Sequence, residues 1–371
     1  MKAKRFFAVF LSTAMGVIGL VGAANYHFDY FGVFHTDEPI LKTGTINDRF
    51  VKMKYLLNDR NFEEYDSYLW GSSRVLKTDT KVTGERTYNL GSPAGMTEDV
   101  LEQLQILLRN GARIGTIYVG LDDFSYYRNY DSVANNLLWI SYKDEWKRDM
   151  EAYSRYLLTP SILRRAVKAG GKPLTYCLRE NGIMLIPDQV EKNIENDVAK
   201  HVGNRNFSEP RIYSGNEREP EEFSRSLRNL REIRRICDEN GIQMKVFFNP
   251  QHMTTYLADD MELMNRFKKE LVKISPFWDF SGVNYVTSNN YFWYETSHPR
   301  AFICDKILDT VSGQNRITWV PDFGVYVTPE NVDDFCEKAV RDRETYDPNH
   351  EQWIPSAEER AVMMKRLNYS R

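Results

Sequence analysis

The chain has 371 residues, a formal net charge of −3 and an aromatic share of 13%. Its basic and acidic residues are interspersed, so it has neither the basic stripe of a nucleic-acid-binding surface nor the acidic run of a solvating tail. The length accommodates one large hydrophobic core or two smaller ones. We therefore expect a globular protein with no nucleic-acid partner.

The first predicted element is an apolar segment at the amino terminus. The uncharged run 6–24 follows three basic residues, Lys2, Lys4 and Arg5. A positive flank before an apolar run is typical of an export signal, and this run is long enough to span a bilayer as a helix. We expect 1–24 to be a signal anchor or a signal peptide cleaved after Ala23 or Ala24, and we favour the uncleaved anchor. The positive-inside rule then places the rest of the chain outside the cytoplasm, in the periplasm or at the cell surface, or in a secreted form if the signal is cleaved.

The remainder alternates between predicted strands and helices. A helix begins near Thr97 and stops at Gly111, and a second follows the apolar positions 223–237 and stops at Gly241. Short strands are predicted over 66–71, 86–92, 113–124, 244–250 and 277–282. Strands separated by helices of this length indicate an α/β fold, a three-layer α/β/α sandwich with a mostly parallel five-stranded sheet.

Four segments are expected along the chain. The signal or anchor, 1–24, is followed by a juxtamembrane segment with a leading helix, 25–65; the α/β domain covers 66–326, and a helical extension covers 327–371. The strand–helix alternation stops between about 125 and 220, where a basic helix-like stretch is predicted over 161–169. We interpret this part as an insertion over the carboxyl ends of the strands, where open sheets bind ligands; a surface decoration without a role is the alternative. It contains aromatic rings suited to stacking on sugars, namely Tyr126, Tyr127, Tyr130, Trp139 and Trp146.

The cysteines and histidines do not indicate a metal site. The four cysteines, Cys177, Cys237, Cys304 and Cys336, are widely spaced and form no C-x-x-C pair, and the six histidines include no H-E-x-x-H motif. The cysteines could form up to two disulfides in an oxidising compartment or stay as buried free thiols. We expect no metal and no cofactor.

The chemistry is expected in a turn and in a distant histidine motif. The turn Gly71–Ser72–Ser73–Arg74 follows the first predicted strand, and Glu295 precedes His298 by three residues. A nucleophilic serine needs a base to take its proton and a carboxylate to orient that base. E-x-x-H alone arises often by chance, and a lone histidine is more often structural. In a parallel sheet, however, both motifs follow strands at one edge and can converge.

In the order of these motifs, the chain resembles the SGNH/GDSL hydrolase superfamily. It is similar in particular to its membrane-anchored branch, which partners membrane-bound O-acyltransferases and includes alginate O-acetylation and teichoic-acid D-alanine transfer proteins. The resemblance rests on "GSSR", "YNLGSPAG", "GLDD" and "ETSH", together with the segments 25–34 and 247–252.

The resemblance implies a role for each matched residue. Ser73, rather than Ser72, would be the nucleophile, His298 the base and Glu295 its orienting carboxylate. The oxyanion hole would comprise Ser73, Gly91 and Asp122. The family has Asn at the position of Asp122, and an aspartate could donate there only when protonated; the backbone N–H groups would carry most of the stabilisation. Substrate contacts are expected from Arg74, Asn89, Asn249 and Tyr294, although Arg74 could instead form an ion pair with Asp122 or Asp123.

The expected function is that of an extracytoplasmic serine acyltransferase. An acyl group, expected to be acetyl, would pass through acyl-Ser73 to a cell-surface or secreted polysaccharide, with a membrane-bound O-acyltransferase as partner. One alternative is a carbohydrate esterase or deacetylase of the same fold. The other is a non-catalytic glycan-binding subunit of an acylation complex, which the Asp122 departure favours.

Overall fold

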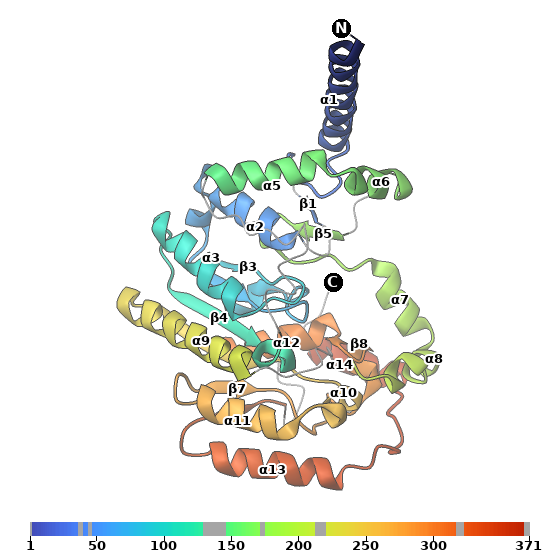
Figure 1. The fold of residues 1–371 in the computed structure, drawn as a ribbon. Coiled ribbons are helices and arrows are strands. Elements are labelled where there is room, and N and C mark those ends of the chain that lie inside the picture. The colour runs from blue at the N-terminus through green and yellow to red at the C-terminus, as the bar shows by residue number, and fades with distance from the viewer. Residues whose placement is uncertain are drawn as a thin grey trace.

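The structure is a computed structural model of the whole chain, and it describes residues 2–35, 40–43, 47–128, 146–170, 175–211, 220–316 and 323–366. Helices surround a central twisted sheet, and one long helix projects from the amino-terminal end of the molecule (Figure 1). Carboxyl-terminal helix α13 (Val332–Thr345) lies at the opposite end (Figure 1).

The central sheet has six strands in the order β10-β7-β6-β4-β2-β3. Its first five strands in the chain pair in parallel, as the sequence predicted, and lie within the expected segments, except that β6 begins at Gln243, one residue before the segment 244–250. The sixth, β10, pairs antiparallel with β7 at the edge and was not predicted. The strands are β2 (Ser67–Trp70), β3 (Thr87–Asn89), β4 (Thr116–Leu121), β6 (Gln243–Phe248), β7 (Phe277–Asp279) and β10 (Val325–Val327). Because β10 belongs to the sheet, the expected domain boundary at residue 326 falls inside this strand.

Helices cover both faces of the sheet, because successive strand residues point to opposite sides. Tyr68 packs in one apolar cluster, while its neighbour Leu69 packs in the other. The first cluster includes side chains of α3 (Thr97–Arg109), α9 (Pro220–Asn240) and α11 (Met261–Leu271). The second includes side chains of α12 (Ala301–Ser312). The α/β class is therefore confirmed, with helices α3 and α9 ending where Gly111 and Gly241 adopt positive φ angles.

The amino-terminal helix α1 (Lys2–Phe28) is long and apolar enough to cross a membrane, and none of its apolar window is buried in the protein. A membrane anchor and a signal sequence share these properties. The juxtamembrane segment after it contains β1 (Ile40–Thr43), α2 (Asp48–Leu57) and the 3-10 helix η1 (Asn58–Glu64).

The expected insertion divides between two places. Its first part, α5 (Trp146–Leu158) and α6 (Pro160–Lys168), packs beside α1, and β5 (Thr175–Leu178) pairs with β1. Its second part, α7 (Asp188–Asn196), α8 (Val198–Val202) and η4 (Arg205–Ser208), lies beside the segment that carries His298. The insertion is therefore not one cover over the strand ends.

The other short elements connect these layers. They are η2 (Thr80–Thr83), η3 (Asp123–Tyr126), α10 (Met253–Ala258), η5 (Asn290–Phe292), β8 (Trp293–Glu295), β9 (His298–Pro299) and α14 (Ala357–Arg366). In the C-terminal extension, Arg360 of α14 pairs with Glu195 of α7 at 2.8 Å. The extension thus packs on the part of the insertion that adjoins the His298 segment.

Candidate active site

The serine turn begins where β2 ends at the sheet edge. Gly71 allows a close approach there: a Cβ atom would lie 3.0 Å from the Val75 methyl groups and 3.2 Å from the Gly120 carbonyl oxygen. Ser72 is fully buried, and its Oγ accepts the Arg74 N–H at 3.2 Å. Ser73 is only partly buried. The turn therefore holds one hydroxyl inside the protein and presents the other.

Glu295 and His298 face each other across a tight hairpin. Strands β8 and β9 pair antiparallel with Glu295 opposite His298. The Ser297 N–H donates to Glu295 Oε2 at 3.0 Å, which fixes the carboxylate. The other carboxylate oxygen, Oε1, hydrogen-bonds to His298 Nδ1. Pairing across two strands thus orients the imidazole.

The structure brings Ser73, His298 and Glu295 together. His298 Nε2 lies 2.7 Å from Ser73 Oγ, although the two residues are 225 positions apart. This distance is within the range that proton transfer from the hydroxyl requires. The three side chains form a continuous serine–histidine–carboxylate chain, the arrangement of a serine nucleophile with its base.

The surroundings of the triad favour a neutral imidazole and an ionised carboxylate. Burial lowers the pKa of His298, and the charges of Lys77 and Arg74 lower it further against the opposing effect of Glu295. Burial would raise the pKa of Glu295, but its hydrogen bond with His298 and the charges of His298 and Arg211 leave that pKa below its usual value. His298 is therefore set up to accept a proton at neutral pH.

Arg74 connects three loops from inside the protein. It is 2% exposed, its Nε donates to the Ser297 carbonyl oxygen at 3.0 Å, and its Nη1 donates to Asp122 at 2.8 Å and to Asp123 at 2.5 Å. Those groups belong to the hairpin turn and to the loop after β4. Of the two roles considered for Arg74, the structure thus shows the ion pair with Asp122 and Asp123. The guanidinium group joins the loops that carry the triad instead of facing a substrate.

Asp122 and Asn249 also belong to this buried cluster. Asn249 Nδ2 donates to Asp122 Oδ1 at 3.1 Å, and both side chains are buried. Burial raises the pKa of Asp122 and nearby Asp123 raises it further, whereas Arg74 opposes the rise. Asn249 thus makes an internal hydrogen bond, and its expected contact with substrate stays a prediction.

The Gly91 loop is held by Asn89. The Gly91 N–H donates to Asn89 Oδ1 at 2.9 Å, and Asn89 Nδ2 donates to the Val75 carbonyl oxygen at 2.7 Å. A Cβ at Gly91 would lie 2.6 Å from Val75 Cγ2, so the loop has no room for a side chain there. In this arrangement the Gly91 N–H already has an acceptor, and Asn89 orders the loop instead of facing a substrate. The Ser73 N–H donates to no other described residue.

Several residues at the site were missed in the sequence. Lys52 of α2 donates to the Gly91 carbonyl oxygen at 2.8 Å, and Lys77 lies 4.1 Å from the centroid of the Tyr294 ring. The hydroxyl of Tyr294, an expected substrate contact, hydrogen-bonds to Glu191 of α7, and the residue is partly exposed. Lys77 follows Ser73 by four residues. That spacing brings the two residues together only if the chain between them is helical or turn-like, and so short a segment has no pattern that predicts this conformation.

Three of the five rings expected to stack on sugars lie among the described residues. Tyr126 and Tyr127 are buried, so no sugar can stack on them. Tyr130 and Trp139 lie outside the described residues. The fifth, Trp146, is 71% exposed but starts α5, in the region of α1. Of the described rings, two therefore fill the core and one lies at the start of a helix beside α1.

The cysteines follow the free-thiol alternative. Cys177, Cys237, Cys304 and Cys336 are all buried and unpaired with one another. Among the described residues, no group of three or more His, Cys, Asp or Glu side chains is arranged to hold a metal ion.

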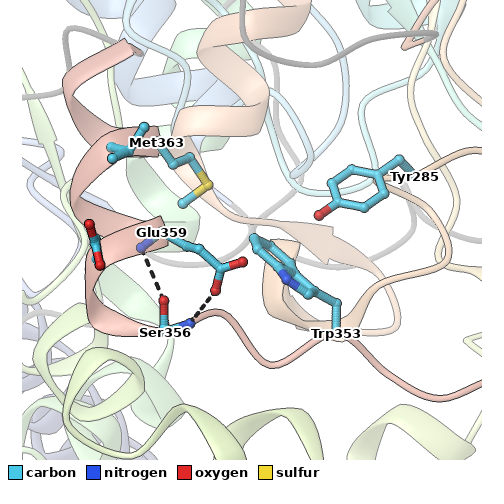
Figure 2. Close-up of a pocket in the computed structure, with 7 residues that line it drawn as sticks. Tyr285, Trp353, Ser356, Glu359 and Met363 are labelled. Carbon is cyan, nitrogen blue, oxygen red and sulfur yellow. Dashed lines mark hydrogen bonds between the residues drawn. The ribbon is translucent and has the colours of Figure 1, made fainter.

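The pocket in Figure 2 is separate from the triad. Its volume is about 520 Å³, and it lies between Tyr285, Trp353 and helix α14. The Ser356 N–H donates to Glu359 Oε2 at 2.7 Å and the Glu359 N–H donates to Ser356 Oγ at 3.2 Å (Figure 2). These groups cap the first turn of α14. Capping of α14 thus accounts for the presence of Ser356 and Glu359 in this pocket without a second catalytic centre.

The lowered pKa of His298 predicts an unusual acid limit. Because the base form must be neutral, kcat/KM for an ester substrate should stay high below about pH 6.5, the ordinary pKa of histidine. Lys77→Met removes a nearby cation, so the pKa of His298 should rise and the fall of kcat/KM at low pH should begin at a higher pH. Lys81 is exposed, and the control variant Lys81→Met should leave the pH of this fall unchanged. The same pH dependence in both variants would contradict the electrostatic role of Lys77.

The Arg74 cluster predicts a large loss of stability. Arg74→Met leaves Asp122 and Asp123 buried without their cation, which should lower the free energy of unfolding by about 3–5 kcal/mol. Arg86 forms an exposed pair with Asp66, and Arg86→Met should cost less than about 1 kcal/mol. Urea unfolding of both variants measures the difference. Equal, small losses would show that the buried pairs contribute little.

Comparisons with known proteins do not assign the chain to a family. No family model matches it. No curated protein matches it either. The interpretation of the triad therefore depends on its geometry, and the resemblance described above stays a prediction.

Proposed function

We propose that the protein is an extracytoplasmic serine acyltransferase of the SGNH type, which moves an acyl group through acyl-Ser73 to a polysaccharide hydroxyl. The observation that carries the proposal is the hydrogen-bonded chain from Ser73 Oγ through His298 to Glu295, with 2.7 Å between Ser73 Oγ and His298 Nε2. Ser73 follows the carboxyl end of the parallel strand β2, where α/β sheets place their ligands, and the β8–β9 hairpin brings His298 and Glu295 to it.

The first half-reaction would form the acyl-enzyme. His298 Nε2 takes the Ser73 proton while Oγ attacks the acyl carbonyl carbon, giving a tetrahedral oxyanion and an imidazolium. Glu295 stabilises that imidazolium through Nδ1. The imidazolium then gives its proton to the donor's leaving oxygen, the carbon–oxygen bond breaks, and Ser73 retains the acyl group as an ester.

The second half-reaction would transfer the acyl group from Ser73 to an acceptor. An acceptor hydroxyl gives its proton to His298 and attacks the acyl-Ser73 carbonyl carbon; collapse of the second oxyanion breaks the Ser73 ester, and the proton returns to Ser73 Oγ. A sugar hydroxyl as acceptor gives transfer, whereas water gives hydrolysis. The acceptor decides between the transferase and the esterase alternative.

Stabilisation of the oxyanion differs from the pattern that the resemblance implies. The Ser73 N–H is available, whereas the Gly91 N–H donates to Asn89. Arg74 Nη2 is a buried donor with no hydrogen-bond partner among the described residues, and its positive charge compensates for Asp122 in place of an amide. We expect Arg74 to contribute electrostatically, because charge placed near a developing oxyanion is often the largest catalytic effect.

Two cations lie close to the triad. Arg211 lies 3.5 Å from Glu295 Oε2 and is largely exposed, and the charge of Lys77, which is partly buried, acts on His298. Positive charge beside the site favours a polar or anionic acceptor. This supports a polysaccharide acceptor, with a membrane-bound O-acyltransferase as the proposed source of acyl groups.

Labelling with a serine-directed fluorophosphonate tests the nucleophile. Wild-type protein and Ser72→Ala should be labelled, whereas Ser73→Ala should not, because only Ser73 Oγ contacts His298. Labelling is measured by gel fluorescence, and its position by mass spectrometry of the labelled peptide. Labelling that survives in Ser73→Ala would remove the triad assignment, and an unlabelled wild type would favour the glycan-binding alternative.

The fate of the acyl group tests the reaction. An acyl-enzyme formed from a simple ester should pass its acyl group to an oligosaccharide when one is present, since a bound hydroxyl has a higher effective concentration than its bulk value. The measurement is the ratio of acylated oligosaccharide to free acid, with and without acceptor. Neutral and anionic glycans should be compared. A ratio of zero for every glycan, with ester still consumed, would establish the esterase alternative instead.

A further inference from the structure

Helices α5 and α6 lie at the base of α1 and run roughly across its axis (Figure 1). The joint between them is a buried amide: Asn25 is 3% exposed, and its Nδ2 donates to the Leu157 carbonyl oxygen at 2.7 Å and to the Thr159 carbonyl oxygen at 3.2 Å. Carbonyl groups at the end of a helix lack partners within the helix. Asn25 supplies partners to the end of α5, so α1 and α5 are fixed to each other.

The length of α1 places this joint at the membrane surface. The apolar run 6–24 contains 19 residues, which at about 1.5 Å per residue gives about 28 Å, close to the 30 Å thickness of the hydrocarbon core. Asn25 is the first residue after that run. A bilayer spanned by α1 would therefore have its outer interface at the level where α5 and α6 begin to contact α1.

The surface at this level has the composition of an interfacial region. Large apolar side chains are exposed on the end of α1 and on α5 and α6: Tyr26 51%, Phe28 39%, Trp146 71%, Met150 64%, Leu158 49% and Val167 64%. Tyrosine and tryptophan are enriched at membrane interfaces. A Cβ at Gly22 would lie 3.7 Å from Leu158 Cδ2, so Leu158 reaches back to the apolar part of α1.

The charges of α6 fit a phosphate-rich surface. This helix contains Arg164, Arg165 and Lys168, all exposed, and no acidic residue. Basic residues beside exposed apolar ones are typical of helices that lie in the plane of the interface, where the cations contact anionic headgroups.

The opposite faces of α5 and α6 are occupied by the protein. Tyr156 of α5 packs on Phe50 of α2, with 5.4 Å between ring centroids, and Ile162 and Ala166 of α6 are buried. The exposed apolar side chains are thus the unpartnered side of two helices whose other side is fixed on the domain.

We propose that α5 and α6 lie in the outer interface of the bilayer that α1 spans, with Met150, Leu158 and Val167 in contact with lipid. The occupant of this surface is the lipid headgroup region, because the surface continues directly from α1. Together with the Asn25 joint, the two helices hold the domain in one orientation on the membrane. This inference does not depend on the proposed enzymatic function.

Depth measurements on the full-length protein test this placement. Nitroxide labels at Met150→Cys and Val167→Cys, in vesicles of phosphatidylcholine and phosphatidylglycerol, should lie about 5–10 Å below the phosphate level, as judged by relaxation with oxygen and with a water-soluble nickel chelate. The matched control is Lys338→Cys, because Lys338 is 65% exposed on α13 at the far end of the molecule. Its label should be fully accessible to the chelate. Wild-type protein treated with the label corrects for the four buried cysteines.

The outcomes separate the membrane from other occupants. Labels at 150 and 167 as accessible to the chelate as the label at 338 would overturn the proposal. Labels that are aqueous in these vesicles but protected in native membranes would also overturn it, in favour of a protein partner. An unchanged thermal unfolding transition in each labelled variant ensures that the depths describe the folded protein.

Discussion

The buried Arg74 guanidinium is the interaction on which the candidate site depends. It reaches the carbonyl group of Ser297 in the β8–β9 turn and the carboxylates of Asp122 and Asp123 after β4, while its own backbone follows Ser73. Removing three charges from water is costly, and their attraction offsets that cost only when all are present in good geometry. The position of His298 over Ser73 therefore depends on a network that contains neither residue.

Local signals made most of the sheet and the triad predictable. A buried strand such as 67–70 that ends at Gly71 has a clear pattern, and parallel pairing places the ends of such strands at one edge. Glu295 and His298 are three residues apart in sequence, and the antiparallel pairing of β8 with β9 brings their side chains together. Ser73 is the more accessible of the two serines, because Ser72 is buried and its Oγ accepts the Arg74 N–H inside the turn.

The remaining features depend on contacts between distant segments. Asn89 looked like a substrate contact, but it bonds to Gly91 and Val75, a role that only the folded loop reveals. The aromatic insertion looked like a single cover, yet Tyr126 is a core residue while Trp146 starts a helix near α1. Aromatic residues are common in protein cores, on sugar-binding surfaces and at membrane interfaces, so the composition of the segment could not distinguish these environments.

The Asn25 joint has a consequence for proteolytic processing. A signal peptidase cutting after Ala23 or Ala24 would create a new α-ammonium group at or next to Asn25, whose side chain is 3% exposed. The new charge would lie beside the hydrogen bonds that Asn25 Nδ2 donates to the end of α5. Processing would therefore change the charge at the joint that links the amino-terminal segment to α5 and, through Tyr156 and Phe50, to α2.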